Sequence, residues 1–489
     1  MSTDYDVIVI GGGAAGLSAA GIATNLGART TLIERDTLGG DCTWTGCIPS
    51  KTLLKAAKVA HQARNGSKYG LPDQAIDIDF RAVMEHVRSV RQEVYEEADR
   101  PEIFEDMAID VRHGEARFVD ARTVAVKQED GSIKHVTGRY IIVATGSRPF
   151  APPIEGLEHV DYLTNDSLFE LEEQPERFGI VGAGPIGTEM AQAFSRLGSD
   201  VTVLEMTDRI LENDDVELAS MLQGILEEEG IEYQFGTAVE RVVEEDGKIR
   251  VETTEGTLER AFDALLLATG RVPNVEGLNL EAAGVEYSRE GVSVDDHCRT
   301  SRGHIYAVGE VTGRYQFTHM SNHMAKVAVT NALLKFPSSI DADHVPWVTY
   351  TDPELAHVGA RAGSLKEEGV TFETYRFPFD KLDRAITEGE TDGLIKVHAK
   401  SMTGKILGAS VLGAHAGELI TSFAIAMRNG VTLRNIGDTI HPYPAWGEGT
   451  RRLADQWYVQ KQSTTFTKGL QGIFGYRGPQ LEYGPDDII

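Results

Sequence analysis

A strand, a glycine-rich turn and the start of a helix follow one another at the beginning of the chain. The stretch DYDVIVIGGGAAGLSAA has the apolar run of a buried strand and then Gly11, Gly13 and Gly16 in the pattern Gly-x-Gly-x-x-Gly. A second strand, TTLIE, ends in the acid Glu34. Such glycines permit a tight turn, a close approach of backbone to pyrophosphate and close packing of helix on strand, while the acid accepts a ribose hydroxyl. The pattern predicts a dinucleotide-binding unit.

The same unit occurs a second time. The stretch RFGIVGAGPIGTEMAQAF carries Gly182, Gly184 and Gly187, and VTVLE ends in Glu205. In both copies 23 residues lead from the first glycine to the acid. Each copy later has an Asp-Gly hairpin signal and an apolar strand that runs into Ala-Thr-Gly. The matched order indicates an internal duplication and predicts an α/β chain with two Rossmann-like domains.

The first copy holds an insertion that the second lacks. Its acid lies 96 residues before the Asp-Gly pair at 130–131, whereas the second acid lies 41 residues before the pair at 246–247. The extra residues include two helical stretches and the segment GGDCTWTGCIPSK, which contains Cys42 and Cys47. Two of the chain's three cysteines therefore belong to the first nucleotide-binding unit.

The two cysteines have three possible roles: a redox pair, a metal clip or a structural bridge. Zinc takes four ligands, and only two cysteines lie here, so we expect no metal site. Three cysteines in a long chain do not form a disulfide scaffold, and in a reducing compartment a close pair is more often redox-active. Their position beside a nucleotide ligand favours the redox role over a structural one.

Charge and hydropathy limit the partners. The net charge of −28 argues against nucleic acid, because phosphate recognition needs clustered cations, and it would repel anionic membranes. No apolar run approaches the roughly 20 residues that span a bilayer. No basic leader precedes the first strand, so we expect a cytoplasmic protein. Such an acidic surface suits a saline cytoplasm, which is a hypothesis about habitat.

These motifs in this order resemble the class I pyridine nucleotide–disulfide oxidoreductases, the flavoprotein family of dihydrolipoyl dehydrogenase, glutathione reductase and mercuric reductase. The resemblance covers essentially the whole chain and includes CxxxxCxPSK, ATGSRP, ATGRVPN, IYAVGEV and VTYTDPELAHVG. It implies FAD in the first unit, NAD(P)H in the second and a C-terminal α+β domain that pairs two subunits. The implied boundaries are 1–150 and 273–340 for FAD, 151–272 for NAD(P) and 341–489 for dimerisation.

The resemblance also implies the cofactor contacts. Those of FAD are Gly11, Gly13, Gly16, Glu34, Lys51, Gly114, Thr145, Gly146, Ser147 and Glu310. Those of NAD are Gly182, Gly184, Gly187, Glu205, Val239 and Gly270. The family has aspartate where Glu310 stands, so we expect a shifted contact and retained FAD. Glu205 would repel a 2′-phosphate, which favours NADH over NADPH, although the nearby Arg209 weakens this preference.

By the same resemblance, Cys47 lies against the flavin and Cys42 faces the substrate. Hydride passes from NADH through FAD to a Cys42–Cys47 disulfide, and Cys42 then attacks the substrate as a thiolate. Lys51, one turn after Cys47, is expected to pair with Glu189 and to tune the flavin. Trp44 is unusual for the family; it either packs in the FAD domain or narrows access to Cys42. The third cysteine, Cys298, is expected to be inert.

The chain departs from the family near its C-terminus. There a histidine that handles the thiol's proton normally stands five residues before a glutamate, here Glu448, but that position holds Tyr443. Tyr443 resembles the arrangement in mercuric reductase, whereas His441-Pro442 is the alternative match with a stretched spacing. We favour Tyr443 as the acid/base, with His441 as the competing candidate.

The electron acceptor stays open. A small disulfide or thiol or a metal ion, as in mercuric reductase, is the favoured class, although no cysteine follows Cys298 to deliver a metal. Dihydrolipoyl dehydrogenase is the first alternative. Two readings from other classes are an NADH:quinone or oxygen flavoenzyme with bystander cysteines and a docking subunit of a 2-oxoacid dehydrogenase complex. A homodimer is expected in every enzymatic case.

Overall fold

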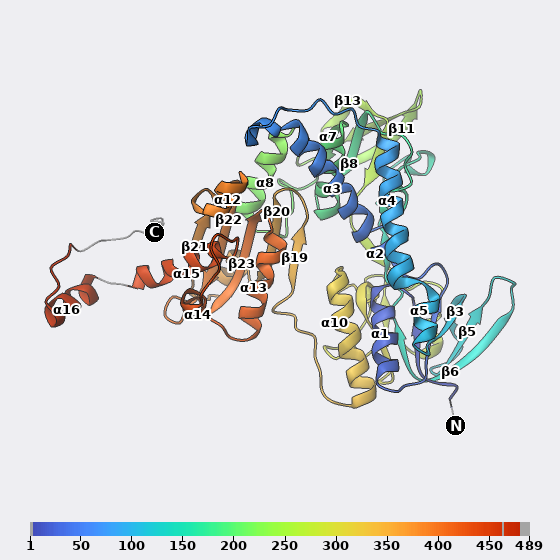
Figure 1. Cartoon of the computed structure of the whole chain (residues 1–489). Coiled ribbons are helices and arrows are strands. Elements are labelled where there is room, and N and C mark those ends of the chain that lie inside the picture. The colour runs from blue at the N-terminus through green and yellow to red at the C-terminus, as the bar shows by residue number, and fades with distance from the viewer. Residues whose placement is uncertain (1–2, 462–463, 480–489) are drawn as a thin grey trace. The chain divides into compact units, whose positions relative to one another are not determined.

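The computed structural model describes residues 3–461 and 464–479 and contains two compact units (Figure 1). The first unit comprises residues 1–57, 77–206 and 236–341, and the second comprises residues 58–76, 207–235 and 342–489. Both glycine-rich motifs and all three cysteines belong to the first unit. The finer four-part division expected from the sequence stays a prediction.

A mostly parallel sheet forms the N-terminal part of the first unit. Its central strand β1 (Tyr5–Ile10) pairs in parallel with β2 (Thr30–Glu34) and β6 (Ile133–Val143). Almost every β1 side chain is buried, as a strand covered on both faces requires. The order is β3-β2-β1-β6-β5-β4, with β18 also paired to β6. The other strands are β3 (Asp110–His113), β4 (Glu115–Phe118), β5 (Thr123–Lys127) and β18 (Ile305–Ala307).

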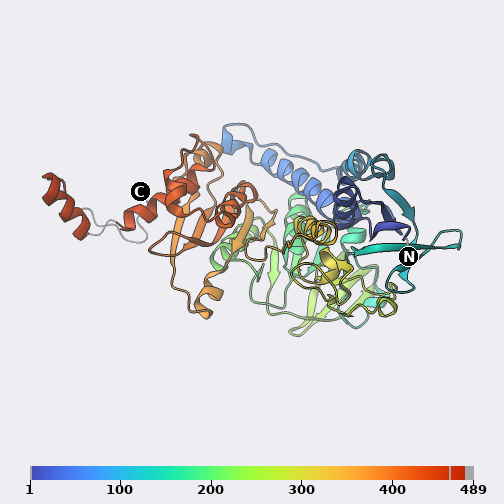
Figure 2. The same cartoon turned by 90° about the horizontal axis from the view of Figure 1, so that it is seen from below.

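Two helices lie side by side in this part of the unit. α1 (Ala14–Asn25), dark blue, follows β1, and α10 (Thr318–Val329), yellow, is its neighbour in both views (Figure 1; Figure 2). The buried side of α1 is made of alanines and a glycine, and such small residues let the packed elements approach closely. α1 starts directly at the glycine turn. Its small side chains let α10 pack closely against it.

The second Rossmann-like module repeats the order of the first. β8 (Arg177–Val181), α7 (Pro185–Leu197) and β9 (Asp200–Leu204) follow one another, and β14 (Ala264–Leu267) pairs in parallel with β8. The expected hairpin joins β11 (Val239–Glu245) to β12 (Lys248–Thr253). Its turn has φ of 53° at Asp246 and 72° at Gly247, as a two-residue hairpin turn of this kind needs. The internal duplication is thus confirmed at the level of the fold.

The insertion that carries the cysteines is helical. α3 (Cys47–Arg64) and α4 (Phe80–Val94) coincide with the two helical stretches expected from the sequence. The Asp79 side chain caps α4 by accepting a hydrogen bond from the Ala82 N–H. Two shorter helices are α2 (Gly40–Trp44) and α5 (Pro101–Asp106).

An antiparallel sheet forms the core of the second unit. Its order is β19-β20-β23-β22-β21. The strands are β19 (Pro346–Thr349), β20 (Glu354–Gly359), β21 (Glu373–Pro378), β22 (Leu394–Ala399) and β23 (Ile406–Gly413). Aromatic and aliphatic side chains of this sheet pack with those of α13 (Ala416–Arg428) and α15 (Glu448–Lys461). α8 (Val216–Glu228) also belongs to this unit.

The remaining elements are short apart from α16. They are α6 (Asn165–Leu168), α9 (Leu280–Ala283), α11 (Ala362–Glu367), α12 (Asp383–Glu388), α14 (Leu433–Asp438), α16 (Thr464–Phe474), β7 (Ser147–Pro149), β10 (Glu232–Gln234), β13 (Gly256–Phe262), β15 (Arg271–Pro273), β16 (Tyr287–Ser288) and β17 (Gly291–Val292). The predicted class, two Rossmann-like α/β modules and a C-terminal α+β part, is confirmed. Within the described ranges, no helix is both long and apolar enough to cross a membrane.

Candidate active site

The first glycine of each motif has the same backbone geometry. φ is 106° at Gly11 and 104° at Gly182, and each N–H donates at 2.8 Å to the carbonyl of the residue before the motif's acid. A Cβ added to Gly11 would lie 2.3 Å from the Ala144 carbonyl oxygen, and one added to Gly182 would lie 2.6 Å from that of Ala268. Only glycine therefore fits either turn.

The second glycine of each motif precedes a helix where a ligand could bind, and the third glycine is needed for packing. Gly13 and Gly184 precede α1 and α7 with no side-chain cap, which leaves the first helical N–H groups for an anion. Gly16 and Gly187 pack inward instead, because a Cβ on either would lie within 1.9 Å of the first glycine's carbonyl oxygen. Gly16 does not line the cavity described below, and its expected place at the pyrophosphate stays a prediction.

The two acids are held alike. The Glu34 carboxylate accepts from the Gly12 N–H, and the Glu205 carboxylate accepts from the Ala183 N–H at 2.7 Å. Two further N–H groups, of Arg35 and Asp36, donate to Glu34 at 2.7 and 2.8 Å. Each carboxylate is fixed beside the glycine turn, where a ribose hydroxyl would meet it.

An open cavity of about 450 Å³ runs along the first motif. Most of the predicted FAD contacts line it: Gly11, Gly13, Glu34, Gly114, Thr145, Gly146, Ser147 and Glu310. Cys42, Trp44 and Thr318 also line this cavity. The structure therefore brings the first glycine turn, the acids Glu34 and Glu310 and one of the cysteines to a single cavity.

Both cysteines of the pair are partly exposed thiols in helices. Cys42 lies in α2, and Cys47 is the first residue of α3. The Cys42 thiol donates to Cys47, which lowers the pKa of Cys47 to about 6, and Thr318 and the Lys51 ammonium act in the same direction. The pKa of Cys42 is raised by the same contact and by burial. Cys47 is therefore the thiolate at neutral pH.

Side chains from other elements anchor the residues between the sulfurs. Thr43 donates to Asp99 at 2.6 Å, and Asn165 donates to the Thr45 carbonyl at 3.2 Å. The Trp44 indole N–H donates to the Leu38 carbonyl at 2.8 Å. The sequence did not reveal Asp99 or Asn165, since neither belongs to a recognised motif.

Trp44 has the packing role that the sequence gave as one of two alternatives. Its ring lies 5.0 Å from that of Tyr95, and the Arg91 guanidinium lies 5.4 Å from the ring centroid. Trp44 is thus packed in the first unit, and it lines the cavity next to Cys42 as well. That the ring narrows access to Cys42 stays a prediction.

The predicted partners Lys51 and Glu189 form an ion pair. Lys51 Nζ lies 2.8 Å from Glu189 Oε2, and the Glu189 side chain is only 5% exposed. Lys51 belongs to α3 and Glu189 to α7, so the pair joins the cysteine helix to the second motif's helix within one unit. A carboxylate this deeply buried requires such a partner.

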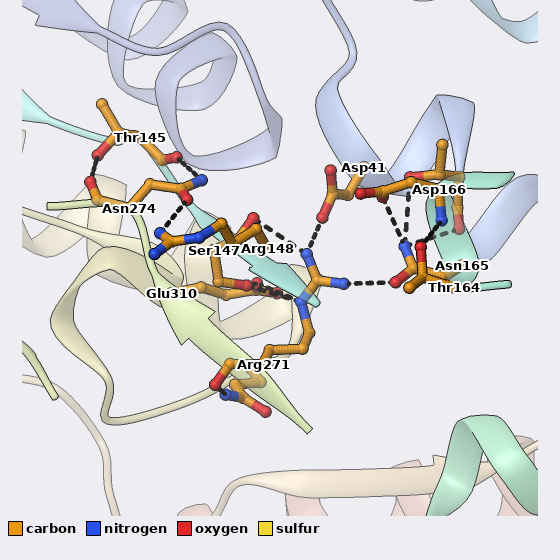
Figure 3. A network of polar contacts seen from close by, with 12 residues as sticks. Asp41, Thr145, Ser147, Arg148, Thr164, Asn165, Asp166, Arg271, Asn274 and Glu310 are labelled. Atoms are coloured by element: carbon orange, nitrogen blue, oxygen red, sulfur yellow. Dashed lines mark hydrogen bonds and ion pairs between the residues drawn. The ribbon is translucent and has the colours of Figure 1, made fainter. Parts of the chain in front are cut away.

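A polar network centred on Arg271 lies beside the cavity (Figure 3). The guanidinium donates to Ser147 Oγ at 2.7 Å and to Asn165 Oδ1 at 3.1 Å, and it forms ion pairs with Asp41 and Glu310. Ser147 Oγ donates in turn to Glu310. Sequence reasoning missed Arg271, although the duplication contains a signal for it: Arg271 follows Thr-Gly in the second copy where Ser147 does in the first.

Two further residues expected to contact NAD lie at or just after strands. Val239 begins β11, and Gly270 has a φ of 106° just after β14.

The candidate residues near the C-terminus lie in the second unit. Tyr443 is 71% exposed in that unit. A ring nitrogen of His441 lies 2.9 Å from the Thr439 carbonyl oxygen, and Glu448, the first residue of α15, pairs with Arg451.

The third cysteine lies in the core of the first unit. Cys298 is fully buried, and burial raises its pKa to about 12, which keeps it a neutral thiol. Among the residues that the structure describes, no group of three or more His, Cys, Asp or Glu side chains could hold a metal ion.

Comparison with known families covers nearly all of the chain. Residues 5–325 match the model for "Pyridine nucleotide-disulphide oxidoreductase", and residues 345–454 match its dimerisation domain, which supports a homodimer. Mercuric reductase from Bacillus cereus is 37% identical over 92% of this chain and 70% of its own length. Dihydrolipoyl dehydrogenase from Bacillus subtilis is 32% identical over 93% of this chain and 98% of its own length.

Solved structures agree with this. The Cu(II) complex of the HOCl-induced flavoprotein disulfide reductase RclA from Escherichia coli matches with a TM-score of 0.82 and 29% identity over 93% of this chain and 100% of that one. LpdA from Mycobacterium tuberculosis matches with a TM-score of 0.86 and 27% identity over 92% and 99%. The chain belongs to the class I pyridine nucleotide–disulfide oxidoreductases and is a FAD-dependent enzyme that uses NAD(P)H.

Proposed function

We propose that this enzyme reduces a small disulfide or a metal ion with NADH and that Cys42 and Cys47 are its redox-active pair. The observation that carries this proposal is the paired sulfurs: the Cys42 thiol donates to Cys47, and Cys42 lines the cavity that contains the predicted FAD contacts. A structural bridge would have no need of such a place, nor of a thiol whose pKa is lowered to about 6.

The residues of the cavity fit FAD. Gly40 crosses so near Gly13 that an added Cβ would lie 2.7 Å from the Gly13 Cα, which leaves a narrow backbone cradle at the start of α1. The N–H groups of that helix suit a pyrophosphate, Glu34 suits a ribose, and Glu310 suits a hydroxyl of the flavin chain. Bound there, FAD supplies the transfer of an electron pair between nicotinamide and sulfur.

Cys42 and Cys47 then carry out the thiol–disulfide exchange. An electron pair and a proton open the Cys42–Cys47 disulfide, which leaves Cys47 as thiolate and Cys42 as thiol. After loss of its proton, Cys42 attacks one sulfur of the substrate disulfide and releases the first product thiol. Cys47 then attacks Cys42 and releases the second, so that one NADH and one proton yield two thiols and NAD⁺. One mercuric ion would instead accept both electrons of a turnover, whereas two cupric ions would accept one electron each.

Protonation of the departing product thiolate is assigned to Tyr443 rather than His441. A hydrogen bond to Asp383 raises the pKa of Tyr443, so the phenol is suited to donate that proton and not to remove the one on Cys42. Tyr443→Phe and His441→Ala, assayed separately, distinguish the two residues. A defect confined to His441→Ala would transfer the role to the histidine.

The nicotinamide is assigned as NADH. The Glu205 carboxylate stands beside the second glycine turn, where a 2′-phosphate would bring another negative charge. Arg209 is the opposing feature, but its guanidinium lies 3.7 Å from Asp208 and donates to the Glu212 carbonyl at 2.7 Å. Steady-state kinetics should give a higher kcat/KM with NADH, and equal or higher values with NADPH would overturn the assignment.

The acceptor is assigned to the metal-ion or small-disulfide class. Similarity to mercuric reductases and to a copper complex of a disulfide reductase favours a metal ion, while the dihydrolipoyl dehydrogenase relatives favour lipoamide as the second candidate. NADH consumption should be measured with mercuric ion, cupric ion, lipoamide, oxidised glutathione and a quinone. Cys42→Ser should abolish turnover with the physiological acceptor. Full activity of Cys42→Ser with every acceptor would identify a flavoenzyme with bystander cysteines.

A further inference from the structure

Arg271 is bonded along its whole guanidinium edge. Nε donates to Ser147 Oγ at 2.7 Å, Nη1 donates to Asn165 Oδ1 at 3.1 Å, and Nη2 donates both to Asp41 and to the Ser147 carbonyl at 3.1 Å (Figure 3). The side chain is 11% exposed. A buried guanidinium with this many partners holds those partners in one arrangement, because its planar fork fixes the directions of its hydrogen bonds.

Arg271 acts from behind the cavity wall. Its partners Asp41, Ser147 and Glu310 line the cavity, whereas Arg271 is absent from that lining. It begins β15, which pairs antiparallel with β7, the strand that starts at Ser147. Backbone pairing thus places Arg271 next to Ser147.

Residues 41–45, the segment that contains Cys42, contact the Arg271 guanidinium directly at one end and through Asn165 at the other. Asp41, directly before Cys42, forms an ion pair with the guanidinium. Asn165, which accepts from Arg271, donates to the Thr45 carbonyl at 3.2 Å. Residues 41 to 45 are therefore held at their first and last members by one side chain that also contacts Glu310.

We propose that Arg271 is a positioning residue that fixes the Cys42 segment relative to Glu310 and the FAD cavity, through Asp41 at one end and Asn165 at the other. The proposal rests on the function proposed above and gives a role to Arg271, the arginine of the motif ATGRVPN, to which the sequence assigned none. Lysine cannot replace arginine here, because one ammonium has no fork with which to reach Asp41, Asn165 and Ser147 together. The consequence is a defined separation between the sulfurs and the flavin site.

Arg271→Lys should lower NADH-dependent turnover by about 10- to 100-fold, the range that a displacement of roughly 1 Å can cost. A second measurement does not depend on turnover. In the reduced protein, the rate of Cys47 alkylation by iodoacetamide is followed against pH by mass spectrometry. Wild type should show a midpoint near 6, and Arg271→Lys should show a higher one, because a loosened segment moves the Cys42 thiol away from Cys47.

Two further variants separate positioning from general damage. Arg314→Lys is the matched control, since Arg314 forms an ion pair with Asp296 at 2.9 Å and does not line the cavity; both measurements should stay at the wild-type value. Asp41→Asn weakens only the contact between Arg271 and the residue directly before Cys42. In the variant that carries both Arg271→Lys and Asp41→Asn, the fold-loss of turnover should be smaller than the product of the fold-losses of the two single variants, because both changes act on one contact.

The outcomes are distinct. If Arg271→Lys matches Arg314→Lys in turnover and in the Cys47 midpoint, or if its effect multiplies with that of Asp41→Asn, the positioning role is wrong while the proposed function stands. If Cys42→Ser turns over like wild type, the proposed function is wrong, and the role of Arg271 in it is wrong too.

Discussion

At the scale of single residues, the chemistry depends on which of two adjacent sulfurs carries the negative charge. The Cys42 thiol donates to Cys47, and Thr318 Oγ1 lies 3.5 Å from Cys47 Sγ. Both contacts, with the nearby Lys51 ammonium, favour the Cys47 thiolate, while the pKa of Cys42 rises. The pair thus has one ready thiolate and one thiol that needs a base before it can attack.

The Cys47 thiolate should be measurable by its ultraviolet absorbance in the reduced protein. Because its pKa is lowered to about 6, the thiolate predominates above that pH and is lost as the pH falls through it. Cys47→Ser should remove the transition. A midpoint at the ordinary thiol value near 8.5 would contradict the assignment of the charge.

Lys51→Ala should raise the pKa of Cys47 and slow reduction of the flavin by NADH, since the ammonium favours the thiolate and pairs with Glu189. Lys55→Ala is the control, because Lys55 is exposed on the same helix one turn later. Stopped-flow reduction and the absorbance titration check both effects. Equal behaviour of the two variants would remove Lys51 from the mechanism.

At the scale of elements, one strand–turn–helix module serves two nucleotides. The two copies agree in the φ of the first glycine, in the N–H that the acid accepts and in the contact behind the third glycine. What differs is the helical insertion after β2, which contains both cysteines and places Cys42 at the first cavity. The insertion is therefore the feature that distinguishes the first module, the proposed redox site, from the second.

Because the two modules are separate, a substitution in one glycine turn should weaken the binding of one cofactor and leave the other bound. Gly182→Ala forces a side chain into a left-handed turn 2.6 Å from a carbonyl oxygen, and strain of about 1–3 kcal/mol should weaken NADH binding by roughly 10- to 100-fold. FAD should be retained. Gly224→Ala, in the open side of α8 with ordinary backbone angles, should change neither. Loss of FAD from Gly182→Ala would contradict the assignment of the second module.

Many of the helices, strands and turns could be predicted from the sequence, because buried strands, glycine turns and amphipathic helices are local patterns. The hairpin at Asp246-Gly247 and the inserted helices α3 and α4 are examples. The Arg271 network could not be predicted, since Arg271 and Asp41 are 230 positions apart and meet only through the pairing of β15 with β7. The inward role of Gly16 likewise required knowledge of what its missing Cβ would touch.

At the scale of the whole molecule, charge acts in two opposite ways. The net charge of −28 lies largely on exposed side chains, where like charges repel and salt screens them. A few pairs are buried instead: in the second unit Lys396 Nζ lies 2.8 Å from both Asp215 and Glu217 carboxylates, and its side chain is 8% exposed. We therefore expect the buried pairs to stabilise the fold and the exposed charges to make its stability depend on salt.

Lys396→Met should destabilise the protein by about 3–5 kcal/mol, because it leaves Asp215 buried without its cation. Arg250→Met removes an exposed pair with Glu245 and should cost at most about 1 kcal/mol. Urea unfolding of both variants makes the comparison. Equal costs would show that the Lys396 pair contributes no more than a surface contact.

Salt should stabilise the whole protein. Removal of salt lengthens the range of repulsion among the acidic side chains, so the thermal midpoint should fall as ionic strength falls. Calorimetry across a salt series checks this. A midpoint that does not change with ionic strength would contradict the hypothesis of adaptation to a saline cytoplasm.

The most direct test of the account is a reductive titration of the pure holoenzyme with NADH. Two redox centres in series, the flavin and the Cys42–Cys47 disulfide, predict an uptake of four electrons per subunit and a long-wavelength absorption band from the Cys47 thiolate beside the flavin. An uptake of only two electrons with no such band would show that the sulfurs take no part in electron transfer.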